Sequence, residues 1–533
     1  MAIDTSQAWQ ALAVHAQTQG QVQLRELFAA DTQRFSQFSL HLGDVLFDYS
    51  KQRVSTKTLA LLADLARTAG LSDAIAGMYA GETINVSEGR AAFHVALRQR
   101  AGVAMRVGSE DVMPQVLATR DKMRFFCDEV RAGHWRGYAG EPIRNIVNLG
   151  IGGSDLGPRM ATEALSACSH PALAVHYVAN LDGADIAPVL ERLDPRSTLF
   201  IVTSKTFSTI ETLTNARTAR NWLLTHAGDA SDAAMARQLV AVTANPAAAL
   251  QFGAHPEHIF EFRDWVGGRF SLWSAVGLPL ALAIGMDNFE RLLAGARTLD
   301  EHFRDAPLEQ NLPVLMALIG IWNINFLGSG HLSIAPYSQS LHLLPQYLQQ
   351  LEMESNGKSI GLDGEALNHA TAPIVWGDAG SNSQHAYFQL LHQGGRLIPS
   401  DFHAFVASDY PLPGHHERLL ANCFAQAEAL AFGNPDADSP LKRCAGNQPS
   451  STFVLPRLDP YHLGLLLAAY EHKTFVQGTI WGINPFDQWG VELGKKLAVR
   501  LLPALEGEAL PTGCDASTAG LVAHSRTLRK QYR

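Results

Sequence analysis

A short loop rich in hydroxyl groups is the first candidate for chemistry. Residues 204–209 read Ser-Lys-Thr-Phe-Ser-Thr and combine four hydroxyls with one ammonium. An apolar run at 199–202 precedes the loop and a helical pattern through Trp222 follows it. The loop is therefore predicted at the carboxyl end of a strand, where open α/β sheets bind ligands. Hydroxyls and N–H groups at a helix N-terminus suit a phosphate, although the same residues could equally be helix caps and Ser/Thr turns.

A second loop, at 150–157, reads Gly-Ile-Gly-Gly-Ser-Asp-Leu-Gly and also follows a predicted strand. Glycines let a backbone approach a ligand closely. The loop fits the GxGxxG dinucleotide fingerprint poorly because Asp155 occupies the sixth position, and it lacks the GK[ST] ending of a nucleotide P-loop. This spacing disfavours a nicotinamide-dependent oxidoreductase. A tight strand-to-helix turn without a ligand is the alternative.

Two carboxylates could act as a base. Glu352 and Glu354 lie in the segment 349–358, Gln-Gln-Leu-Glu-Met-Glu-Ser-Asn-Gly-Lys, where Asn356-Gly357 predicts a helix stop. A carboxylate in a last helical turn faces the negative end of the helix dipole, which suits a general base. Residues two apart do not share a helix face, so at most one is expected in a site. A solvated acidic helix end is the alternative.

Three cationic or titratable side chains complete the candidates. Arg269 is the sole cation between Asp264 and Met286, and in such an apolar setting it needs an anion, either a ligand or a structural carboxylate. His385 follows a polar loop and could move a proton, although a structural histidine is the alternative. Lys495 follows an aromatic, amide-rich loop and could donate to a sugar, although an ordinary solvated helix face would look the same.

No catalytic metal or other cofactor is expected. The chain has no HExxH motif, and the pairs His255/His258 and His415/His416 lack a third ligand at helpful spacing. The five cysteines are dispersed and form no CxxC pair, which argues against a disulfide framework or a cysteine zinc site and favours a reducing compartment.

Strands and helices that alternate along the chain must position these candidate residues. Apolar strands are predicted at 145–149, 199–202, 239–242 and 373–376, each followed by a loop, and helical patterns alternate with them, for example at 384–392. This rhythm predicts parallel sheets covered by helices on both faces. The first 120 residues look mainly helical, with a helix at 56–68 capped by Ser55 and stopped by Gly70. We expect α/β domains at 121–290 and 311–500, a helical region at 1–120 packing with the second, and a C-terminal extension at 501–533.

The composition narrows the class of protein. A chain of 533 residues with a formal charge of −9 and no basic arm is a poor candidate for binding nucleic acid. The N-terminal residues lack the features of a signal peptide. The uncharged stretches 271–286 and 312–330 are too short or too polar to span a membrane and are predicted to be buried helices. A soluble cytoplasmic protein is expected.

Taken together, these segments resemble the phosphoglucose isomerase family over roughly residues 40 to 500, in the family's order. Phe270 and Ser208 stand where other residues also occur in the family and remove no required chemistry. The similar segments are 85–98, 150–158, 203–207, 264–277, 353–358, 382–386 and 478–496. The resemblance implies two sugar isomerase (SIS) domains, each a parallel sheet between helices, with a helical N-terminal region and a C-terminal extension. It also implies a homodimer that interconverts glucose 6-phosphate and fructose 6-phosphate without a cofactor.

The resemblance also assigns residues. The phosphate would be bound near Gly153 and Ser154 by Ser204, Lys205, Thr206 and Thr209, and the sugar would be lined by Gln350, Glu354, His385, Lys495 and Arg269. His385 and Lys495 would open the sugar ring, Glu354 would move a proton between C2 and C1, and Arg269 would stabilise the charge that develops. In the family, the histidine reaches the site from the partner subunit. A non-catalytic sugar-phosphate sensor on the same domains is the alternative, but it need not keep these four residues together.

Overall fold

The computed structural model describes residues 2–532, which form two compact units that divide between Pro485 and Phe486. The first unit contains both large sheets. The second unit consists of two helices that pack on one another, α20 (Trp489–Glu506) and α21 (Ala516–Tyr532). The expected domain edge at residue 500 falls within α20.

The first sheet is entirely parallel, with the order β6-β5-β7-β8-β9. Its strands are β5 (Asn145–Leu149), β6 (Ala174–Val178), β7 (Thr198–Thr203), β8 (Leu239–Thr243) and β9 (Ile259–Glu261). Every residue of β7 and β8 is buried, as expected for central strands covered on both faces. The strands predicted at 145–149, 199–202 and 239–242 are confirmed.

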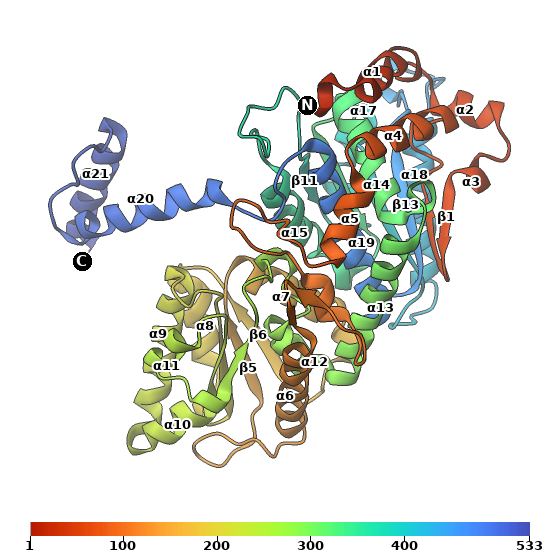
Figure 1. Ribbon diagram of the computed structural model, residues 1–533. Coiled ribbons are helices and arrows are strands. Elements are labelled where there is room, and N and C mark those ends of the chain that lie inside the picture. The colour runs from red at the N-terminus through yellow and green to blue at the C-terminus, as the bar shows by residue number, and fades with distance from the viewer. Residues whose placement is uncertain (1, 533) are drawn as a thin grey trace. The chain divides into compact units, whose positions relative to one another are not determined.

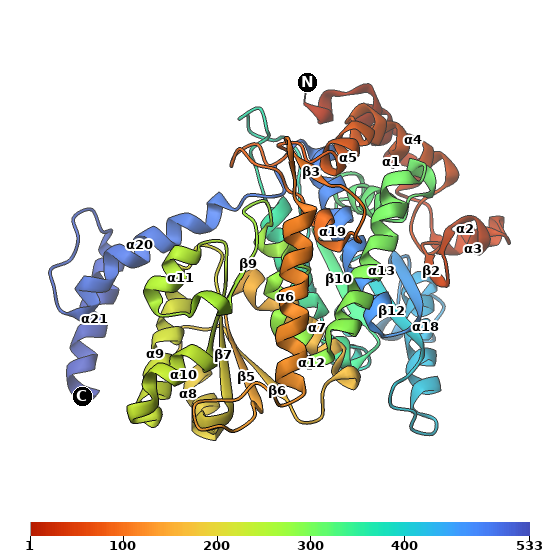
Figure 2. The ribbon, with the colours of Figure 1, turned by 60° about the horizontal axis from the view of Figure 1, so that its bottom comes forward.

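Helices cover both faces of this sheet (Figures 1 and 2). One face carries α8 (Gly183–Arg192), α9 (Ile210–Ala227), α10 (Ser231–Gln238) and α11 (Pro246–Phe252). The other face carries α6 (Met113–Arg131), α7 (Leu156–Ala164) and α12 (Leu278–Ile284). All seven residues of α12 are buried, so the apolar stretch 271–286 is a core segment as predicted.

The second sheet has the order β1-β2-β13-β12-β10-β11. Its parallel strands are β10 (His331–Pro336), β11 (Ile374–Gly377), β12 (Ser400–Ala407) and β13 (Ser450–Arg457). An antiparallel hairpin, β1 (Ser39–Leu42) and β2 (Val45–Asp48), extends the sheet beside β13. The hairpin comes from the region expected to be mainly helical, and the Phe47 and Phe453 rings, 4.7 Å apart, join it to the sheet.

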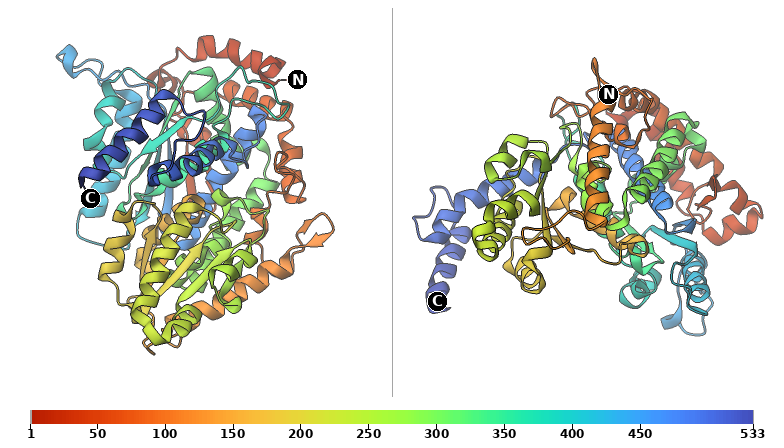
Figure 3. Two further views of the ribbon diagram at one scale, coloured as in Figure 1. Left: turned by 90° about the vertical axis from the view of Figure 1, so that its left-hand side faces the viewer. Right: turned by 90° about the horizontal axis from the view of Figure 1, so that it is seen from below.

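Alternate residues of β12 show how the second sheet is covered. Phe402 and Ala404 pack in a core with α17 (Phe388–Gln393) and α18 (His415–Phe432). Asp401 and His403 instead contact Tyr470 of α19. Because successive strand residues point to opposite faces, α19 (Pro460–Trp481) covers the other face. The predicted helix 384–392 is split at Tyr387 into α16 (Asn382–Ala386) and α17. Figure 3 gives two further views of the two sheets and their helices.

The N-terminal region packs its helices on the helices that cover the second sheet. It contains α1 (Gln7–Gln19), α2 (Leu24–Ala30), α3 (Arg34–Gln37), α4 (Thr56–Thr68) and α5 (Leu71–Tyr79). Of these, α2 packs on α18 and α5 packs on α19. The predicted helix 56–68 is confirmed with its cap, because the Thr58 N–H donates to Ser55 Oγ over 3.3 Å and the Ser55 N–H donates to Thr58 Oγ1 over 3.1 Å.

The remaining elements connect the sheets. They are the ribbon β3 (Arg106–Val107) and β4 (Glu110–Asp111), α13 (Met286–Asp305), α14 (Leu312–Ile321) with a π-helix at Trp322–Phe326, and α15 (Leu344–Leu348) with a π-helix at Gln349–Glu354. Among residues 2–532, no helix is long and apolar enough to cross a membrane.

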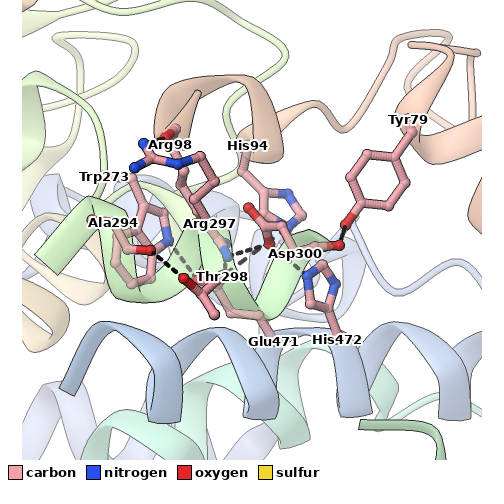
Figure 4. A network of polar contacts seen from close by, with 10 residues as sticks. All are labelled: Tyr79, His94, Arg98, Trp273, Ala294, Arg297, Thr298, Asp300, Glu471 and His472. Carbon is pink, nitrogen blue, oxygen red and sulfur yellow. Dashed lines mark hydrogen bonds and ion pairs between the residues drawn. The ribbon is translucent and has the colours of Figure 1, made fainter. Parts of the chain in front are cut away.

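A buried ionic cluster joins four segments that lie far apart in the sequence (Figure 4). Arg98, at the end of the short helix His94–Arg98, is fully buried and pairs with Asp300 of α13, 2.8 Å away, and with Glu471 of α19. Glu471 accepts from the Trp273 indole N–H over 2.8 Å, and Asp300 contacts His472 Nε2 over 2.7 Å. The cluster ties the N-terminal block to both long core helices and to the segment that carries Arg269.

We predict that Glu471→Gln destabilises the protein strongly, because it leaves the Arg98 guanidinium buried with one carboxylate fewer. Breaking a buried ion pair costs about 3–5 kcal/mol. The matched control is Glu301→Gln, an exposed glutamate on the same helix as Asp300, which should change stability by no more than about 0.5 kcal/mol. Urea-unfolding midpoints of the two variants measure the difference, and equal midpoints would contradict the prediction.

Candidate functional site

The two predicted loops lie side by side at the carboxyl edge of the first sheet. The glycine loop follows β5 and forms a short 3-10 turn, Gly152–Ser154. The hydroxyl loop follows β7. Thr203 Oγ1 donates to Asn148 Oδ1 over 2.8 Å, and Asn148 Nδ2 donates to the Ser154 carbonyl over 3.0 Å. This pair of bonds fixes the two loops relative to one another.

The hydroxyl loop is held by its own side chains. Ser204 Oγ accepts from the Phe207 N–H over 3.1 Å and lies 3.2 Å from Thr209 Oγ1. Phe207 has a φ of 53°, unusual for a residue with a side chain, and its buried ring anchors the loop in the core. The exposed hydroxyls of Thr206 and Ser208 are 2.7 Å apart. The loop ends at Thr209, the N-cap of the 18-residue helix α9, so hydroxyls and a positive helix end share one place.

Lys205 ties this loop to the segment that follows β9. Its ammonium donates to the Asp264 and Val266 carbonyls over 2.6 and 2.8 Å. Burial, assisted by the nearby Arg90 guanidinium, lowers the pKa of Lys205 to about 8. The side chain is therefore positively charged at neutral pH and loses that charge at mildly alkaline pH.

Arg269 and Glu354 form an ion pair at the centre of the site. Arg269 is 5% exposed, and its Nη1 lies 3.1 Å from Glu354 Oε2. Its Nε donates to Ser355 Oγ over 2.8 Å and its Nη2 donates to the Pro485 carbonyl over 3.0 Å. Gln350 Nε2 donates to the same Glu354 carboxylate over 2.9 Å. Arg269, which was predicted to need an anion, is therefore paired with Glu354, one of the two carboxylates predicted as a base.

Close backbone contacts bring the glycine loop to this pair. A Cβ at Gly153 would lie 2.1 Å from the Gly268 carbonyl oxygen, so a side chain there would force the segments apart. A Cβ at Gly152, whose φ is 61°, would lie 3.1 Å from Gln350 Nε2. The glycines therefore allow the turn 152–154, the Arg269 segment and the Glu354 helix to meet.

The two glutamates occupy different surroundings, as their spacing predicts. Glu352 is 2% exposed and forms a buried ion pair with Lys473 of α19. The Glu354 side chain is 22% exposed and faces Arg269 and Gln350. A solvated acidic helix end therefore describes neither residue.

His385 and Lys495 take part in none of the contacts described above. His385 is exposed on α16, which follows the carboxyl end of β11. Glu354 precedes β11, and its neighbour Met353 contacts the Val375 N–H through Sδ at 3.4 Å. Lys495 belongs to the second unit, where its ammonium lies 2.9 Å from Glu492 on α20. Ser154, Lys205, Arg269, Gln350 and Glu354 are joined through the contacts above.

Sequence reasoning missed several supporting residues. Asn148 and Thr203 link the loops, Ser355 holds Arg269, and Glu471 holds Trp273. Ser355 lies inside a singled-out motif, but its partner Arg269 is 86 positions earlier. Glu471 could have been found in the sequence, because the three ionisable residues 471–473 lie in the middle of an otherwise apolar helical stretch. Charged side chains in such a stretch are buried and must be paired.

The sequence analysis found no third metal ligand beside the histidine pairs, but the structure provides one for His255 and His258. Glu257 lies with His255 and His258, and their possible ligand atoms are within 4.8 Å of one another. This group precedes the amino end of β9, whereas the two loops follow the carboxyl ends of β5 and β7. It therefore lies at the other end of the first sheet from the candidate site.

The fold and the site define a two-sheet α/β protein with a hydroxyl-rich loop at the carboxyl end of a strand and a carboxylate–guanidinium pair. The phosphoglucose isomerase family model matches residues 48–522. A glucose-6-phosphate isomerase of Dechloromonas aromatica is 55% identical over 527 residues, covering 97% of this chain and 98% of its own length. Another, of Methylococcus capsulatus, is 49% identical over 540 residues, covering 98% of each. The chain belongs to the phosphoglucose isomerase family.

A solved structure agrees over the whole chain. The crystal structure of a glucose-6-phosphate isomerase from Chlamydia trachomatis matches with a TM-score of 0.88 and 32% identity, covering 99% of this chain and 100% of that one. The predicted α/β class with two parallel-sheet domains is confirmed. The sequence did not lead us to expect the N-terminal hairpin of the second sheet or the ribbon β3–β4, both in the region predicted to be mainly helical.

We predict that phosphate binding depends on the charge of Lys205. Lys205→Met should weaken binding of inorganic phosphate at pH 7 about tenfold or more, since a hydrogen bond to a charged group is worth about 1.5–3 kcal/mol. Binding to the unaltered protein should weaken as pH rises through about 8, because the ammonium is then neutralised. Calorimetric titration measures both effects. Lys122→Met, which removes a partly buried lysine of α6, is the control and should bind normally. A pH profile that survives in Lys205→Met would contradict the assignment.

Proposed function

We propose that this protein is a glucose-6-phosphate isomerase that interconverts glucose 6-phosphate and fructose 6-phosphate through a cis-enediol(ate). The observation that carries the proposal is the half-buried Glu354 carboxylate, held by Arg269 and Gln350 against the glycine loop. The reaction moves one hydrogen between adjacent carbons. At the position of Glu354 it therefore needs only a group that accepts a proton and returns it. No hydride carrier or metal is required for that step.

Glu354 acts as the base that removes the proton from C2 and returns it to C1. Arg269 stabilises the negative charge that develops on the intermediate, and it is well placed because its guanidinium is fixed by Ser355 and Pro485 as well as by Glu354. A donor that is already oriented loses little free energy in reorganisation when the charge appears. Gln350 orients the carboxylate, and its amide also lies beside the Gly152 turn.

The phosphate is held remotely from the reacting carbons by Ser204, Lys205, Thr206 and Thr209, next to Gly153 and Ser154. The N-terminus of α9 and the Lys205 charge favour an anion there. Binding free energy from the phosphate then orients the sugar toward Glu354. In this scheme residues 121–290 supply the phosphate site and residues 311–500 supply the base, His385 and Lys495.

Ring opening is assigned to His385 with Lys495, in a homodimer. Within one chain, Glu354 ends a π-helix that precedes β11, whereas His385 lies exposed on α16, which follows β11. An exposed histidine is available to a partner subunit, which supports a site completed by His385 of the partner subunit. We also propose a cytoplasmic location, which the five unpaired cysteines favour. A sugar-phosphate sensor is disfavoured because it would not require the Glu354–Arg269 pair.

We predict that Glu354→Gln lowers kcat by about 10²–10⁴-fold with little change in KM, since it keeps the shape and removes the base. In deuterated water the unaltered enzyme should exchange the transferred hydrogen with solvent to some degree, because a carboxylic acid can trade its proton. The variant should lose exchange and isomerisation together while anomer interconversion persists.

The matched control is Glu352→Gln. It removes a buried partner of Lys473 and should lower stability while its folded fraction retains kcat. A coupled assay of fructose 6-phosphate conversion, normalised to folded protein, separates the two variants. The assignment is wrong if Glu354→Gln isomerises at a near-native rate and Glu352→Gln does not.

We predict that mixed dimers recover activity. Glu354→Gln and His385→Ala subunits, each inactive alone, should form hybrids in which one site has both native residues. Differently tagged subunits allow the hybrids to be purified and assayed. No recovery in verified hybrids would count against a shared site, without affecting the role of Glu354.

A further inference from the structure

One cluster of metal-ligating side chains lies outside the isomerase site. Among residues 2–532, His255, Glu257 and His258 form the single group of three or more His, Cys, Asp or Glu whose possible ligand atoms all lie within 4.8 Å of one another. They belong to the connection between α11 and β9, around the short 3-10 turn Pro256–His258. None of them takes part in the proposed isomerisation.

The backbone of the turn brings the two imidazoles together. His255 is the N-cap residue of this turn and His258 is its last residue. The His258 N–H donates to the His255 carbonyl over 2.9 Å, which closes the turn, and Pro256 begins it. The two ring centroids are 5.1 Å apart at an interplanar angle of 40°. The closed backbone turn and the short distance between the rings make the two imidazoles neighbours.

His258 has the surroundings of a histidine that binds a metal. Its Nδ1 is buried without a hydrogen-bond partner among the described residues, and its ring interacts with the backbone of Ala236. A metal-bound imidazole commonly uses its second nitrogen to contact a backbone carbonyl, which orients the ring. The Trp135 ring packs edge-on against it with centroids 4.8 Å apart.

We propose that His255, Glu257 and His258 bind one divalent transition-metal ion. Two imidazoles and one carboxylate form a donor set that suits zinc, with water in the remaining position. Magnesium and calcium are disfavoured because they prefer oxygen ligands. The ion would clamp the connection that leads into β9, an edge strand of the first sheet, at the end of that sheet away from the phosphate loop. It is a structural ion and takes no part in the proposed isomerisation.

The test is a calorimetric titration of the chelator-treated full chain with zinc chloride. The unaltered protein should bind one ion at this cluster, and both Glu257→Gln and His258→Ala should weaken that binding about tenfold or more. Glu257 is exposed, so its variant should fold even if His258→Ala does not. The matched control is the double variant His415→Ala/His416→Ala, which removes another histidine pair and should leave the binding unchanged.

Trp135 supplies a second, local measurement. Copper(II) bound beside His258 should quench the fluorescence of the adjacent indole, and Trp135→Phe should remove that part of the quenching while zinc affinity is retained. Equal binding in all variants would mean adventitious binding to surface histidines and would overturn the proposal, as would no binding at all. Isomerase activity should be the same with and without zinc. If chelation abolished activity and zinc restored it only in protein that keeps Glu257, the structural role of the ion would be overturned. If the protein were inactive under all conditions, the proposed function would be contradicted instead.

Discussion

The buried Arg98 guanidinium sets the strongest constraint on this structure. A cation with no solvent exposure is costly unless anions surround it, and Asp300 and Glu471 supply them from α13 and α19. Because Glu471 also binds the Trp273 indole, the position of the charged cluster fixes the segment that carries Arg269. The Trp273 ring in turn lies under the Arg98 guanidinium at 4.4 Å. Arg269 is thus positioned by charges that have no contact with the sugar in the proposed mechanism.

In the candidate site, each charged side chain is paired with an opposite charge or with carbonyl oxygens of the protein itself. Arg269 neutralises Glu354, Lys473 neutralises the adjacent Glu352, and backbone carbonyls accept the Lys205 ammonium. Such pairing allows several charges to stay within a partly buried region. It also separates the surroundings of the two glutamates, since Glu352, which faces α19, is 2% exposed and the Glu354 side chain, which faces the glycine loop, is 22% exposed.

Local sequence patterns predicted many elements of the fold and of the candidate site. The features that were not predicted depend on contacts between residues far apart in the sequence. The strand 145–149 and the helix 56–68 follow from apolar runs and a cap within the segment itself. The β1–β2 hairpin was missed because its four-residue strands gain their stability from β13, far along the chain. Likewise, the residues could not decide between Glu352 and Glu354, because the deciding partner, Lys473, lies 121 positions after Glu352. The glycine and hydroxyl loops were found because each carries its chemistry in consecutive residues.

The distance along the chain between Arg98 and Glu471 has a consequence for biosynthesis. The two residues are 373 positions apart, and at translation rates of about 5–20 residues per second roughly 20–75 s pass between their synthesis. The strands and helices of the first sheet, which lie between them, can fold on the ribosome during that time. The N-terminal block meanwhile carries a cation whose two carboxylates are not both present. Chains that end before α19 would therefore keep the surfaces around Arg98 open, and nascent chains of intermediate length are the ones most exposed to chaperones and proteases.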